Sequence, residues 1–479
     1  MTDQHGTPSD IEIRLRPFRE KMLRAGLPGL VIDTFAYYYT RLVTGDTGRI
    51  SDRDIAPVTD HEIAHLQDVS AYQEAGRKAL KHAVVIKLNG GLGTSMGLCK
   101  AKSLLEAKNG LSFLDIIVRQ VLSLREMAGV RLPLLFMNSF RTHADTMHAL
   151  AVYEDLAVND LPIGFVQHKF PKVLQEGPAP AAWPADPALE WNPPGHGDLY
   201  LALTTSGILK RLLDAGIRHA FISNSDNLGA ETDEALLGYF SQTDADFMME
   251  VAERTPTDRK GGHLARLHDG RLVLREIAQC PDDERDAFQD ITRYRYFNTN
   301  NIWIDLRALD RLLRRHNHVL PLSMIRNPKT IDPRDDASPP VFQLETAMGA
   351  AISVFERATA IRVPRRRFAP VKKCQDLLTL WSDAYVLTDE YRVALNPKRT
   401  PKPPVVDLDE RFFKKIDQLR ERFPGGAPSL LQCCSLKVRG DVVFGKDVQV
   451  HDEVSITNHG SAQVSIPDGT VIDHDLVFD

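Results

Sequence analysis

A strand-like run that leads directly into a cluster of glycines is the strongest chemical signal in this sequence: VVIKLNGGLGTSMG, residues 84–97. Gly90, Gly91, Gly93 and Gly97 lack a Cβ atom, so the backbone can turn tightly here and point amide N–H groups at an anion. A helix that followed the turn would add the positive end of its dipole. The segment therefore predicts an anion-binding loop, with a plain strand-to-helix turn as the alternative.

Two common phosphate loops do not match the glycine spacing. A P-loop requires Gly, four residues and then Gly-Lys-Ser/Thr, and no register here supplies that order. The dinucleotide fingerprint Gly-x-Gly-x-x-Gly, started at Gly91, meets Met96 where its third glycine belongs, and Gly97 comes one residue late. An NAD-dependent oxidoreductase is therefore disfavoured. Lys100 and Lys102 follow in CKAKSLL, within reach of an anion held by the loop.

Two later segments also carry groups that could do chemistry. In HAFISNSDN, Asp226 comes at the end of an apolar strand, where α/β sheets place their sites. An Asx turn or a helix cap is the alternative for this carboxylate. The loop PPGHGD is stiffened by Pro193 and Pro194, while Gly195 admits close contact with a flat base.

The elements that must position these residues are visible as short apolar runs from Ala83 onward. They are AVVIKL (83–88), LPLLFMN (132–138), LPIGFVQ (161–167), HAFISNSD (219–226), DFMMEVA (246–252), RLVLREI (271–277) and NNIWID (300–305). Amphipathic helical patterns lie between several of them, as at 113–127 and 344–358. Such alternation predicts an α/β domain over residues 81–395, doubly wound around a mixed, mostly parallel sheet.

The two ends of the chain differ from this central part. Residues 1–80 predict a helical N-terminal segment, because 11–25 and 61–82 are rich in helix formers, with a loop expected around 44–58. Residues 396–479 begin with the linker-like NPKRTPKPPV, and beyond Leu430 Val, Ile and Phe recur with Gly, Asp and Asn at the corners. This recurrence predicts a small C-terminal β-solenoid of left-handed β-helix type, with a β-meander as the alternative.

Composition narrows the function classes. The chain has 479 residues, 43% of them hydrophobic and 26% charged, and a formal net charge of −5. A nucleic-acid or anionic-membrane binder is usually basic, so both classes are disfavoured. No run approaches the ~18 apolar residues of a membrane helix, and the polar N-terminus is unlike a secretory signal. Five cysteines without a C-x-x-C favour a reducing compartment, the cytoplasm.

Eight segments in fixed order resemble the UTP–glucose-1-phosphate uridylyltransferases of the eukaryotic type. They are LNGGLGTSMG with CKAKSLL, MNSF (137–140), PPGHGD (193–198), SNSDNLGA (223–230), KGGHLA (260–265), FNTNN (297–301), QLETAMGAA (343–351) and RFAPVK (367–372). The C-terminal solenoid also matches, and the resemblance implies a nucleotide-diphospho-sugar transferase-like fold. Related enzymes often carry Pro before the second lysine of the loop, where this chain has Ala101.

The resemblance implies a reversible, Mg²⁺-dependent reaction of UTP with glucose 1-phosphate that yields UDP-glucose and pyrophosphate. The sugar phosphate has a second pKa of about 6, so it attacks the α-phosphate of UTP in line without a general base. Repulsion between the two substrates reaches several kcal/mol per charge pair at ~4 Å. Catalysis should therefore come from cations and backbone amides. Lys102 and Lys372 are the expected catalytic cations.

The remaining site residues are also carried over from the family, position by position. Asp226 is the expected Mg²⁺ ligand, since one carboxylate with phosphate oxygens suits this cation. Gln167 is expected to read uracil, because its amide can both donate and accept. The expected nucleotide-binding residues are Leu88, Asn89, Gly90, Gly91, Met137, Gln167 and Gly195. The expected residues for the sugar phosphate are His196, Asn224, Gly261, Glu276, Asn298 and Asn300.

Three questions stay open at the level of sequence. A UDP-N-acetylhexosamine or broad UDP-sugar pyrophosphorylase would share the same chemistry, although KGG and FNTNN favour glucose 1-phosphate. An inactive sugar-nucleotide sensor or an assembly scaffold is a further alternative, against which the retained Lys102, Asp226 and Lys372 argue. The chain could be a monomer, or it could form a homo-oligomer through its C-terminal part.

Overall fold

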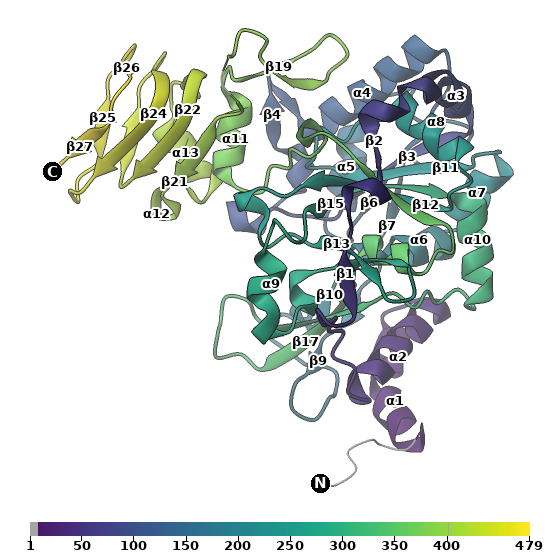
Figure 1. The fold of residues 1–479 in the computed structure, drawn as a ribbon. Coiled ribbons are helices and arrows are strands. Elements are labelled where there is room, and N and C mark those ends of the chain that lie inside the picture. Colours follow the sequence, from purple (N-terminus) through teal and green to yellow (C-terminus); the bar gives the residue numbers. More distant parts are fainter. Residues whose placement is uncertain (1–7, 401) are drawn as a thin grey trace.

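A large mixed sheet forms the centre of the computed structural model, which describes residues 8–400 and 402–479 (Figure 1). The strand order is β2-β18-β12-β15-β11-β3-β6-β7. Neighbours pair in parallel except at β15, which is antiparallel to both β12 and β11. The predicted mixed, mostly parallel α/β sheet is confirmed. In the order of the sheet, the strands span Ala64–His65, Ala358–Arg362, Phe247–Glu253, Tyr296–Asp305, His219–Asn224, Ala83–Asn89, Leu134–Asn138 and Gly164–Val166.

Both faces of the sheet are covered, as the continuous apolar strands predict. All seven residues of β3 are buried, and they alternate between two cores, with Val85 in one and Val84 and Ile86 in the other. Helices α4 (Phe113–Ala128) and α8 (Glu234–Gln242) cover the side of Val85. Helices α6 (Leu199–Thr205), α7 (Ile208–Asp214) and α10 (Leu306–Arg315) cover the opposite side.

The two ends of helix α4 are set by its local sequence. Ser112 Oγ accepts from the N–H of Asp115 at 3.1 Å, and the N–H of Ser112 donates to the Asp115 carboxylate at 2.9 Å. This capping box begins the helix, and Gly129 at φ +63° ends it. The helix predicted at 113–127 is thus confirmed to within one residue.

The N-terminal segment is helical only in part. Helices α1 (Pro8–Arg24) and α2 (Gly29–Val43) pack through aromatic rings, with Phe18 5.0 Å from Phe35. Two short strands interrupt the segment. β1 (Ile55–Pro57) lies where a loop was expected and pairs with β13 (His263–Leu267). β2 pairs with β18, so the helical prediction is wrong at Ala64–His65. Both short strands cover sheet edges that would otherwise expose unpaired backbone groups. Helix α3 (Gln73–Ala79) then packs on α8.

The helix predicted at 344–358 is also wrong. Strand β17 (Pro340–Thr346) pairs there with β16 (Met324–Thr330), and a buried 3-10 turn follows at Met348–Ser353. A Cβ atom at Gly349 would lie 2.7 Å from Leu274 and 3.0 Å from the Asn298 amide. Tertiary packing thus overrides the helical period, because this segment has to pass close beneath the central sheet.

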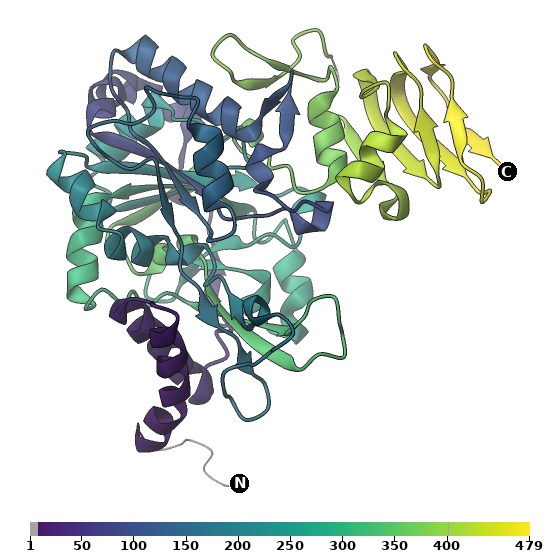
Figure 2. The ribbon, with the colours of Figure 1, turned by 180° about the vertical axis from the view of Figure 1, so that it is seen from behind.

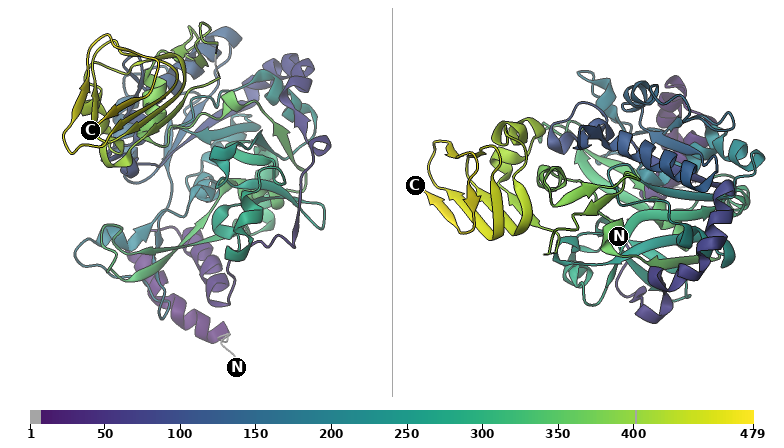
Figure 3. Two further views of the ribbon diagram at one scale, coloured as in Figure 1. Left: turned by 60° about the vertical axis from the view of Figure 1, so that its left-hand side comes forward. Right: turned by 90° about the horizontal axis from the view of Figure 1, so that it is seen from above.

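The C-terminal part is a stack of parallel strands that projects from one side of the molecule (Figure 3). Every strand pairing in it is parallel, whereas a meander pairs antiparallel. Two short helices, α12 (Glu410–Phe413) and α13 (Ile416–Arg422), lie between its first two strands in the sequence. The strands β21 to β27 span Val405–Leu408, Ser429–Arg439, Val442–Phe444, Gln449–Asn458, Val464–Ile466, Val471–Ile472 and Leu476–Phe478.

The linker-like segment before this stack is anchored to it. The buried guanidinium of Arg399 donates to the carbonyls of Leu430, Leu431 and Cys433. One continuous apolar core also runs from the sheet face beneath α4 into the strand stack. Seen from behind, the stack lies well away from α1 and α2 (Figure 2).

The other elements are short, and all five cysteines are free. None of the helices within residues 8–400 and 402–479 is long and apolar enough to cross a bilayer. The short elements are α5 (His143–Leu150), α9 (Arg285–Gln289), α11 (Cys374–Trp381), β4 (Glu106–Lys108), β5 (Leu111–Ser112), β8 (Phe170–Pro171), β9 (Val173–Leu174), β10 (Trp191–Asn192), β14 (Leu272–Arg275), β19 (Tyr385–Leu387) and β20 (Val393–Leu395).

Candidate active site

The predicted residues lie together where the order in which the strands are added to the sheet changes direction. From β3 the chain builds β6 and β7 on one side and then returns to place β11 on the other. Register aligns Leu88 of β3 with Met137 of β6 and with Asn224 of β11. Gln167 directly follows β7 at the same edge. The carboxyl ends of these strands therefore form a topological switch point, the usual ligand site of an open α/β sheet.

A cavity of about 320 Å³ opens at this point, large enough to admit part of a nucleotide. Ten of the predicted residues line it, together with Pro193 and Ser225. Four predicted residues of the sugar side, together with Lys372 and Asn89, lie outside its wall. The ten are Leu88, Gly90, Gly91, Lys102, Met137, Gln167, Gly195, His196, Asn224 and Asp226.

Asn89 has a supporting place behind the wall. Its buried amide donates to Asn138 Oδ1 at 2.8 Å and to Thr146 Oγ1 at 2.9 Å. Its oxygen accepts from Ser225 Oγ at 3.0 Å. The side chain is therefore fully engaged in joining the ends of β3, β6 and β11.

The glycine loop closes on itself instead of leading into a helix. The N–H of Lys102 donates to the carbonyl of Gly91 at 3.1 Å, and Gly93 sits at φ +65°. Two 3-10 turns follow, and α4 begins only at Phe113. The expected helix dipole at this loop is therefore wrong. The loop can still attract an anion through its backbone amides and through Lys102.

Lys102 and Asp226 form an ion pair in the wall of the cavity. Lys102 Nζ lies 2.7 Å from Asp226 Oδ2 and also donates to the carbonyl of Val371. Ala101, at the position where the resemblance leads us to expect proline, adopts φ −54°, within the range that a proline ring imposes. The approach of Lys102 to the site is thus preserved without the ring.

The segment that carries Lys372 is attached to the back of the site. The N–H of Val371 donates to the carbonyl of Asp226 at 3.1 Å, and that of Ala369 to Asn227 Oδ1 at 3.0 Å. Lys372 itself is exposed at the rim, with Nζ 5.7 Å from the centre of the Phe368 ring.

A buried ion pair anchors the start of this segment. The guanidinium of Arg367 makes two bonds of 2.8 Å to the carboxylate of Glu250. Trp303 Nε1 donates to the same carboxylate at 2.9 Å, and Asn301 Nδ2 at 3.1 Å. The sequence places Arg367 in the basic run RRRF, which is usually a solvated face. Burial of Arg367 corrects that interpretation.

His196 is held as a neutral ring in one orientation. The N–H of Met348 donates to His196 Nδ1 at 3.0 Å, so Nδ1 must be unprotonated and Nε2 carries the hydrogen. Burial lowers the pKa of His196 to about 4, so the ring is neutral at physiological pH. Such a histidine can donate one hydrogen bond from Nε2 but supplies no positive charge.

Gly195 is required by its surroundings. It sits at φ +78°, and a Cβ atom would lie 2.4 Å from the carbonyl oxygen of Thr346. The strand end carrying Thr346 supports the loop, because its N–H donates to the carbonyl of Pro194 at 2.8 Å. Strand β17, whose end lies where a helix was predicted, therefore helps to shape the site.

The predicted sugar-side residues form a second group beside the cavity. Asn298 Nδ2 donates to Asn300 Oδ1 at 2.8 Å, and the N–H of Asn300 donates to Asn298 Oδ1 at 2.9 Å. Both lie in strand β15. A Cβ atom at Gly262, next to the predicted Gly261, would lie 2.4 Å from Glu276 Oε2.

The pKa of Glu276 connects this second group to Lys372. Burial raises the pKa of Glu276, and the positive charge of Lys372 lowers it. The pairing of β11 with β15 ends at Ile222 opposite Ile302, and beyond it Asn227 Nδ2 lies 3.4 Å from Asn301 Oδ1. The segment that follows β11 therefore lies beside the stretch of β15 that carries Asn298 and Asn300.

The carboxylate of Asp226 is the group in the cavity that could hold Mg²⁺. The described part of the chain holds no group of three or more His, Cys, Asp or Glu side chains that could bind a metal alone. Asp226 Oδ2 contacts Lys102, while Oδ1 has no hydrogen-bond partner in that same part of the chain. One carboxylate that leaves most positions to phosphate oxygens and water suits Mg²⁺.

Several residues that shape the site were missed from the sequence. Asn227, Glu250, Arg367, His168 and Asp198 all bond to the backbone or side chains of the segments that carry site residues. Asn227, Asp198 and Arg367 lie in the quoted segments SNSDNLGA, PPGHGD and RFAPVK, which were the available signal. The partner of Asp198, His168, is distant in sequence, and no local pattern pairs the two.

Comparisons with known proteins bear on this site. A family model described as UTP–glucose-1-phosphate uridylyltransferase matches residues 32–451. The UTP–glucose-1-phosphate uridylyltransferase of Solanum tuberosum is 40% identical over 438 residues, 90% of this chain and 89% of that protein. That of Saccharomyces cerevisiae is 38% identical over 451 residues, 93% and 88% of the two chains.

Solved structures agree with the sequence relatives. A mutant of the UDP-glucose pyrophosphorylase of Leishmania major, in complex with UDP-glucose, superposes with a TM-score of 0.90 at 43% identity, covering 97% of this chain and 99% of that one. A UDP-glucose phosphorylase of Trypanosoma brucei superposes with a TM-score of 0.88 at 44% identity, covering 97% and 100%.

Proposed function

The chain belongs to the UTP–glucose-1-phosphate uridylyltransferase family, and from that premise we propose how its site makes UDP-glucose and pyrophosphate from UTP and glucose 1-phosphate. One observation carries the proposal. Lys102, Asp226, Gln167 and His196, which come from four separate segments, line one cavity at the switch point of the sheet. This set supplies a cation, a carboxylate, a base-reading amide and a hydrogen-bond donor.

The main barrier of the reaction is electrostatic. The phosphate of glucose 1-phosphate, with a second pKa of about 6, is largely a dianion at neutral pH and needs no general base. It must approach a triphosphate of like charge, against a repulsion of several kcal/mol per charge pair at ~4 Å. Groups that neutralise and align the phosphates therefore lower the barrier most.

Two lysines and the glycine loop perform this neutralisation. The amides at Gly90 and Gly91 and the ammonium of Lys102 hold the UTP phosphates, while Lys372 approaches from the rim. Lys102 and Asp226 form an ion pair at 2.7 Å, so the lysine is held in the cavity before substrate arrives. Arriving phosphates compete with Asp226 for this ammonium.

The base is read at the other end of the cavity. The side-chain amide of Gln167 is nearly buried and has no hydrogen-bond partner within the described residues, which leaves both its N–H and its C=O available to uracil. Gly90 makes room for this amide, because a Cβ atom there would lie 3.1 Å from Nε2. Cytosine would set a donor against a donor, a mismatch that costs ~1–3 kcal/mol.

The sugar phosphate lies between the two groups of residues. His196 donates to it from Nε2, since Nδ1 is occupied by the N–H of Met348. Asn224, Glu276, Asn298 and Asn300 contact the hydroxyls of glucose, for which amides and a carboxylate are suitable partners. Gly261 lets the sugar approach the backbone.

Asp226 would hold Mg²⁺ together with phosphate oxygens of both substrates. When bound, the ion neutralises the charge between the two phosphates. Activity should disappear on treatment with EDTA and return with added Mg²⁺, and Asp226→Asn should raise the Mg²⁺ concentration needed for half activity. Full turnover in EDTA would exclude the metal.

A coupled assay of pyrophosphate release tests the function itself. UTP should be offered with glucose 1-phosphate, N-acetylglucosamine 1-phosphate and galactose 1-phosphate, and glucose 1-phosphate should give the highest kcat/KM. Preference for an N-acetylhexosamine would reassign the enzyme to a related pyrophosphorylase. Binding of UDP-glucose without turnover of any pair would favour the sensor.

We also propose the organisation of the whole chain as three parts: residues 1–80, a catalytic part at 81–395, and 396–479. The uniformly parallel pairing of the last part supports a small β-solenoid. Exposed Val471 and Val477 on its outer strands support association of copies through this part, with a monomer as the alternative. The five free cysteines support a cytoplasmic location.

A further inference from the structure

Asp198 is a buried carboxylate that none of the proposed steps uses. It is 3% exposed, and its oxygens accept two hydrogen bonds from a single residue, His168. The main-chain N–H of His168 lies 2.6 Å from Asp198 Oδ2, and ring atom Nδ1 lies 3.0 Å from Oδ1. The other ring nitrogen, Nε2, lies 3.0 Å from Thr205 Oγ1. The imidazole is therefore held at both nitrogens.

This pair joins two segments that touch opposite ends of the expected substrates. His168 directly follows Gln167, the expected reader of uracil. Asp198 ends the turn that carries Gly195 and His196, and its N–H donates to the carbonyl of Gly195 at 3.3 Å. A bond between Asp198 and His168 therefore sets the distance between the base-reading amide and the turn that meets the sugar phosphate.

Gln167 is anchored on both sides of its own peptide. Its N–H donates to the carbonyl of Asn138 at the end of β6, at 2.8 Å. The next N–H along the chain is the one that Asp198 accepts. Because the backbone is held at both peptides, the side-chain amide of Gln167 enters the cavity from a fixed origin.

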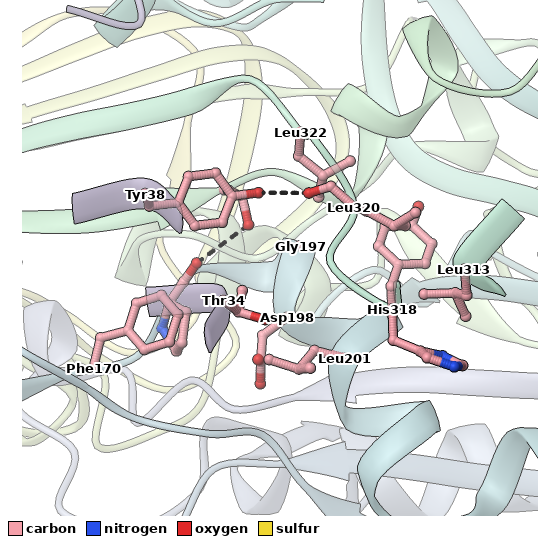
Figure 4. Close-up of a pocket in the computed structure, with 13 residues that line it drawn as sticks. Thr34, Tyr38, Phe170, Gly197, Asp198, Leu201, Leu313, His318, Leu320 and Leu322 are labelled. Atoms are coloured by element: carbon pink, nitrogen blue, oxygen red, sulfur yellow. Dashed lines mark hydrogen bonds between the residues drawn. The ribbon is translucent and has the colours of Figure 1, made fainter. Parts of the chain in front are cut away.

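Within the described residues, no donor other than His168 is bonded to the Asp198 carboxylate. A small cavity of about 30 Å³ lies behind the turn, and its wall holds Thr34, Tyr38 and His318 beside four leucines (Figure 4). None of these side chains bonds the carboxylate, so the contacts with His168 fix its direction. Burial raises the pKa of Asp198, and the hydrogen bonds from His168 lower it.

We propose that Asp198 and His168 form a positioning pair that fixes the distance between the base-reading amide of Gln167 and the turn that binds the sugar phosphate. The proposal rests on the proposed function and deepens it. Neither residue touches the reacting atoms. Loss of the pair should let the Gln167 segment and the 195–198 turn shift independently, which weakens discrimination between uracil and cytosine before it affects the transfer step.

Steady-state kinetics with UTP and CTP test this role. In His168→Ala, the UTP/CTP ratio of kcat/KM should fall by about 5-fold or more and the KM for UTP should rise about 10-fold. The value of kcat should stay within about 3-fold. In Gln167→Ala the ratio also falls, and adding His168→Ala to it should lower the ratio no further, because His168 acts through Gln167.

Conservative variants separate positioning from general stability. In His168→Asn, Nδ2 can occupy the place of Nδ1 and donate to Asp198, so selectivity should be retained. In His168→Gln the amide is one bond further from the backbone, so selectivity should fall. His82→Ala is the matched control. His82 Nδ1 contacts the carbonyl of Gly216 at 2.9 Å, and His82 directly precedes the amino end of β3, at the opposite end of the strands from the site. His82→Ala should change neither KM nor selectivity.

Wild-type KM and selectivity in a folded His168→Ala would overturn the proposal. If that variant does not fold, the comparison of Asn with Gln decides, and equal selectivity in these two would likewise overturn it. Failure of the proposed function has a different signature, the absence of turnover in the wild type. Calorimetric titration with UTP and CTP would then test the pair by binding alone.

Discussion

At the scale of single residues, the proposed mechanism assigns the chemistry to the cations Lys102 and Lys372, and Lys372 offers the cleanest test. Lys372→Ala should lower kcat by ~10² or more, because a preorganised charge at the phosphates is worth ~3 kcal/mol in the transition state. Lys372 is exposed, so the fold should be unaffected. The measurement is kcat beside a thermal melt.

Lys373→Ala is the control for this prediction. Lys373 is the next residue, also exposed, and Nζ lies 2.7 Å from Glu410 Oε1 and not in the site. Loss of one surface ion pair should change stability by ~1 kcal/mol or less and leave kcat unchanged. Equal activity of the Lys372 variant and the wild type would remove Lys372 from the mechanism.

Gly195 tests the shape of the base pocket. Gly195→Ala should raise the KM for UTP at least ~10-fold, because the new Cβ atom would lie 2.4 Å from the carbonyl oxygen of Thr346 and must push the loop away from β17. Gly207 has a similar φ of +72° and no atom within 4 Å of its Cβ position, so Gly207→Ala measures the backbone strain alone.

The comparison of these two glycine variants separates strain from collision. Gly207→Ala should lose ~1–2 kcal/mol of stability, because Gly207 adopts the left-handed conformation at φ +72° and ψ 5°. Gly195→Ala should lose more, because φ +78° with ψ 176° is a region that glycine alone occupies readily. Only Gly195→Ala should change the KM for UTP. An unchanged KM in that variant would show that the loop moves without consequence for the base.

At the scale of elements, the buried pair of Arg367 and Glu250 holds the 367–372 segment to the sheet. Arg367→Met should destabilise the protein by ~3–5 kcal/mol, because it leaves the Glu250 carboxylate buried without a cation. Replacing both residues, as in Arg367→Met with Glu250→Leu, should recover much of this loss. Urea unfolding of the single and double variants provides the measurement.

A double variant as unstable as the single one would contradict this interpretation, because the cost would then lie in packing and not in the unpaired charge. The kinetic consequence is a separate question. Residues 369–371 are also held by Asn227 and Asp226 through backbone bonds, which remain in both variants. We therefore expect kcat to fall less than in Lys372→Ala.

At the scale of the whole molecule, buried neutral histidines make the stability depend on pH. His263 is fully buried between the rings of Tyr294 and Phe288, at 3.9 and 4.8 Å. Neither of its nitrogens has a hydrogen-bond partner in the described residues. Burial, together with the charges of Arg254 and Arg275, lowers its pKa to about 3.

The direction of the pH effect follows from this lowered pKa. In the unfolded chain His263 has a pKa of 6.5 and binds a proton below that pH, whereas in the folded chain it stays neutral until about pH 3. The free energy of unfolding is therefore highest above pH 6.5 and decreases as the pH falls toward 3. Between about pH 7.5 and about pH 5.5 the wild type should lose ~1.4 kcal/mol more than His263→Phe. Urea unfolding at both pH values measures this difference.

His459→Phe is the control, since His459 is exposed. It should show the pH dependence of the wild type. An identical pH dependence in His263→Phe would mean that His263 takes up no proton on unfolding in this range.

The sequence by itself determined the fold class, the family and most of the cavity wall. Continuous apolar strands and the capping box of α4 are local signals, because burial and turn chemistry are written in neighbouring residues. The glycines, Lys102, Gln167, His196 and Asp226 belong to short motifs of the same local kind. Ten predicted residues therefore line one cavity.

Local signals failed where distant chain segments compete. Ala64–His65 forms an edge strand, and 344–358 forms the end of a strand and a 3-10 turn, because these segments pair with the sheet edge and support the loop at Gly195. The glycine loop led to no helix for a similar reason. Lys102 turns back to meet Asp226, which lies 124 residues further along the chain.

Only the tertiary structure decided how the site residues act on one another. The N–H of Met348 sets the tautomer of His196, Glu250 buries Arg367, and Asp198 holds the peptide next to Gln167. Each of these contacts joins residues that are 30 or more positions apart. Hydrogen bonds and ion pairs depend on distances of about 3 Å, which a one-dimensional pattern of residue types does not contain.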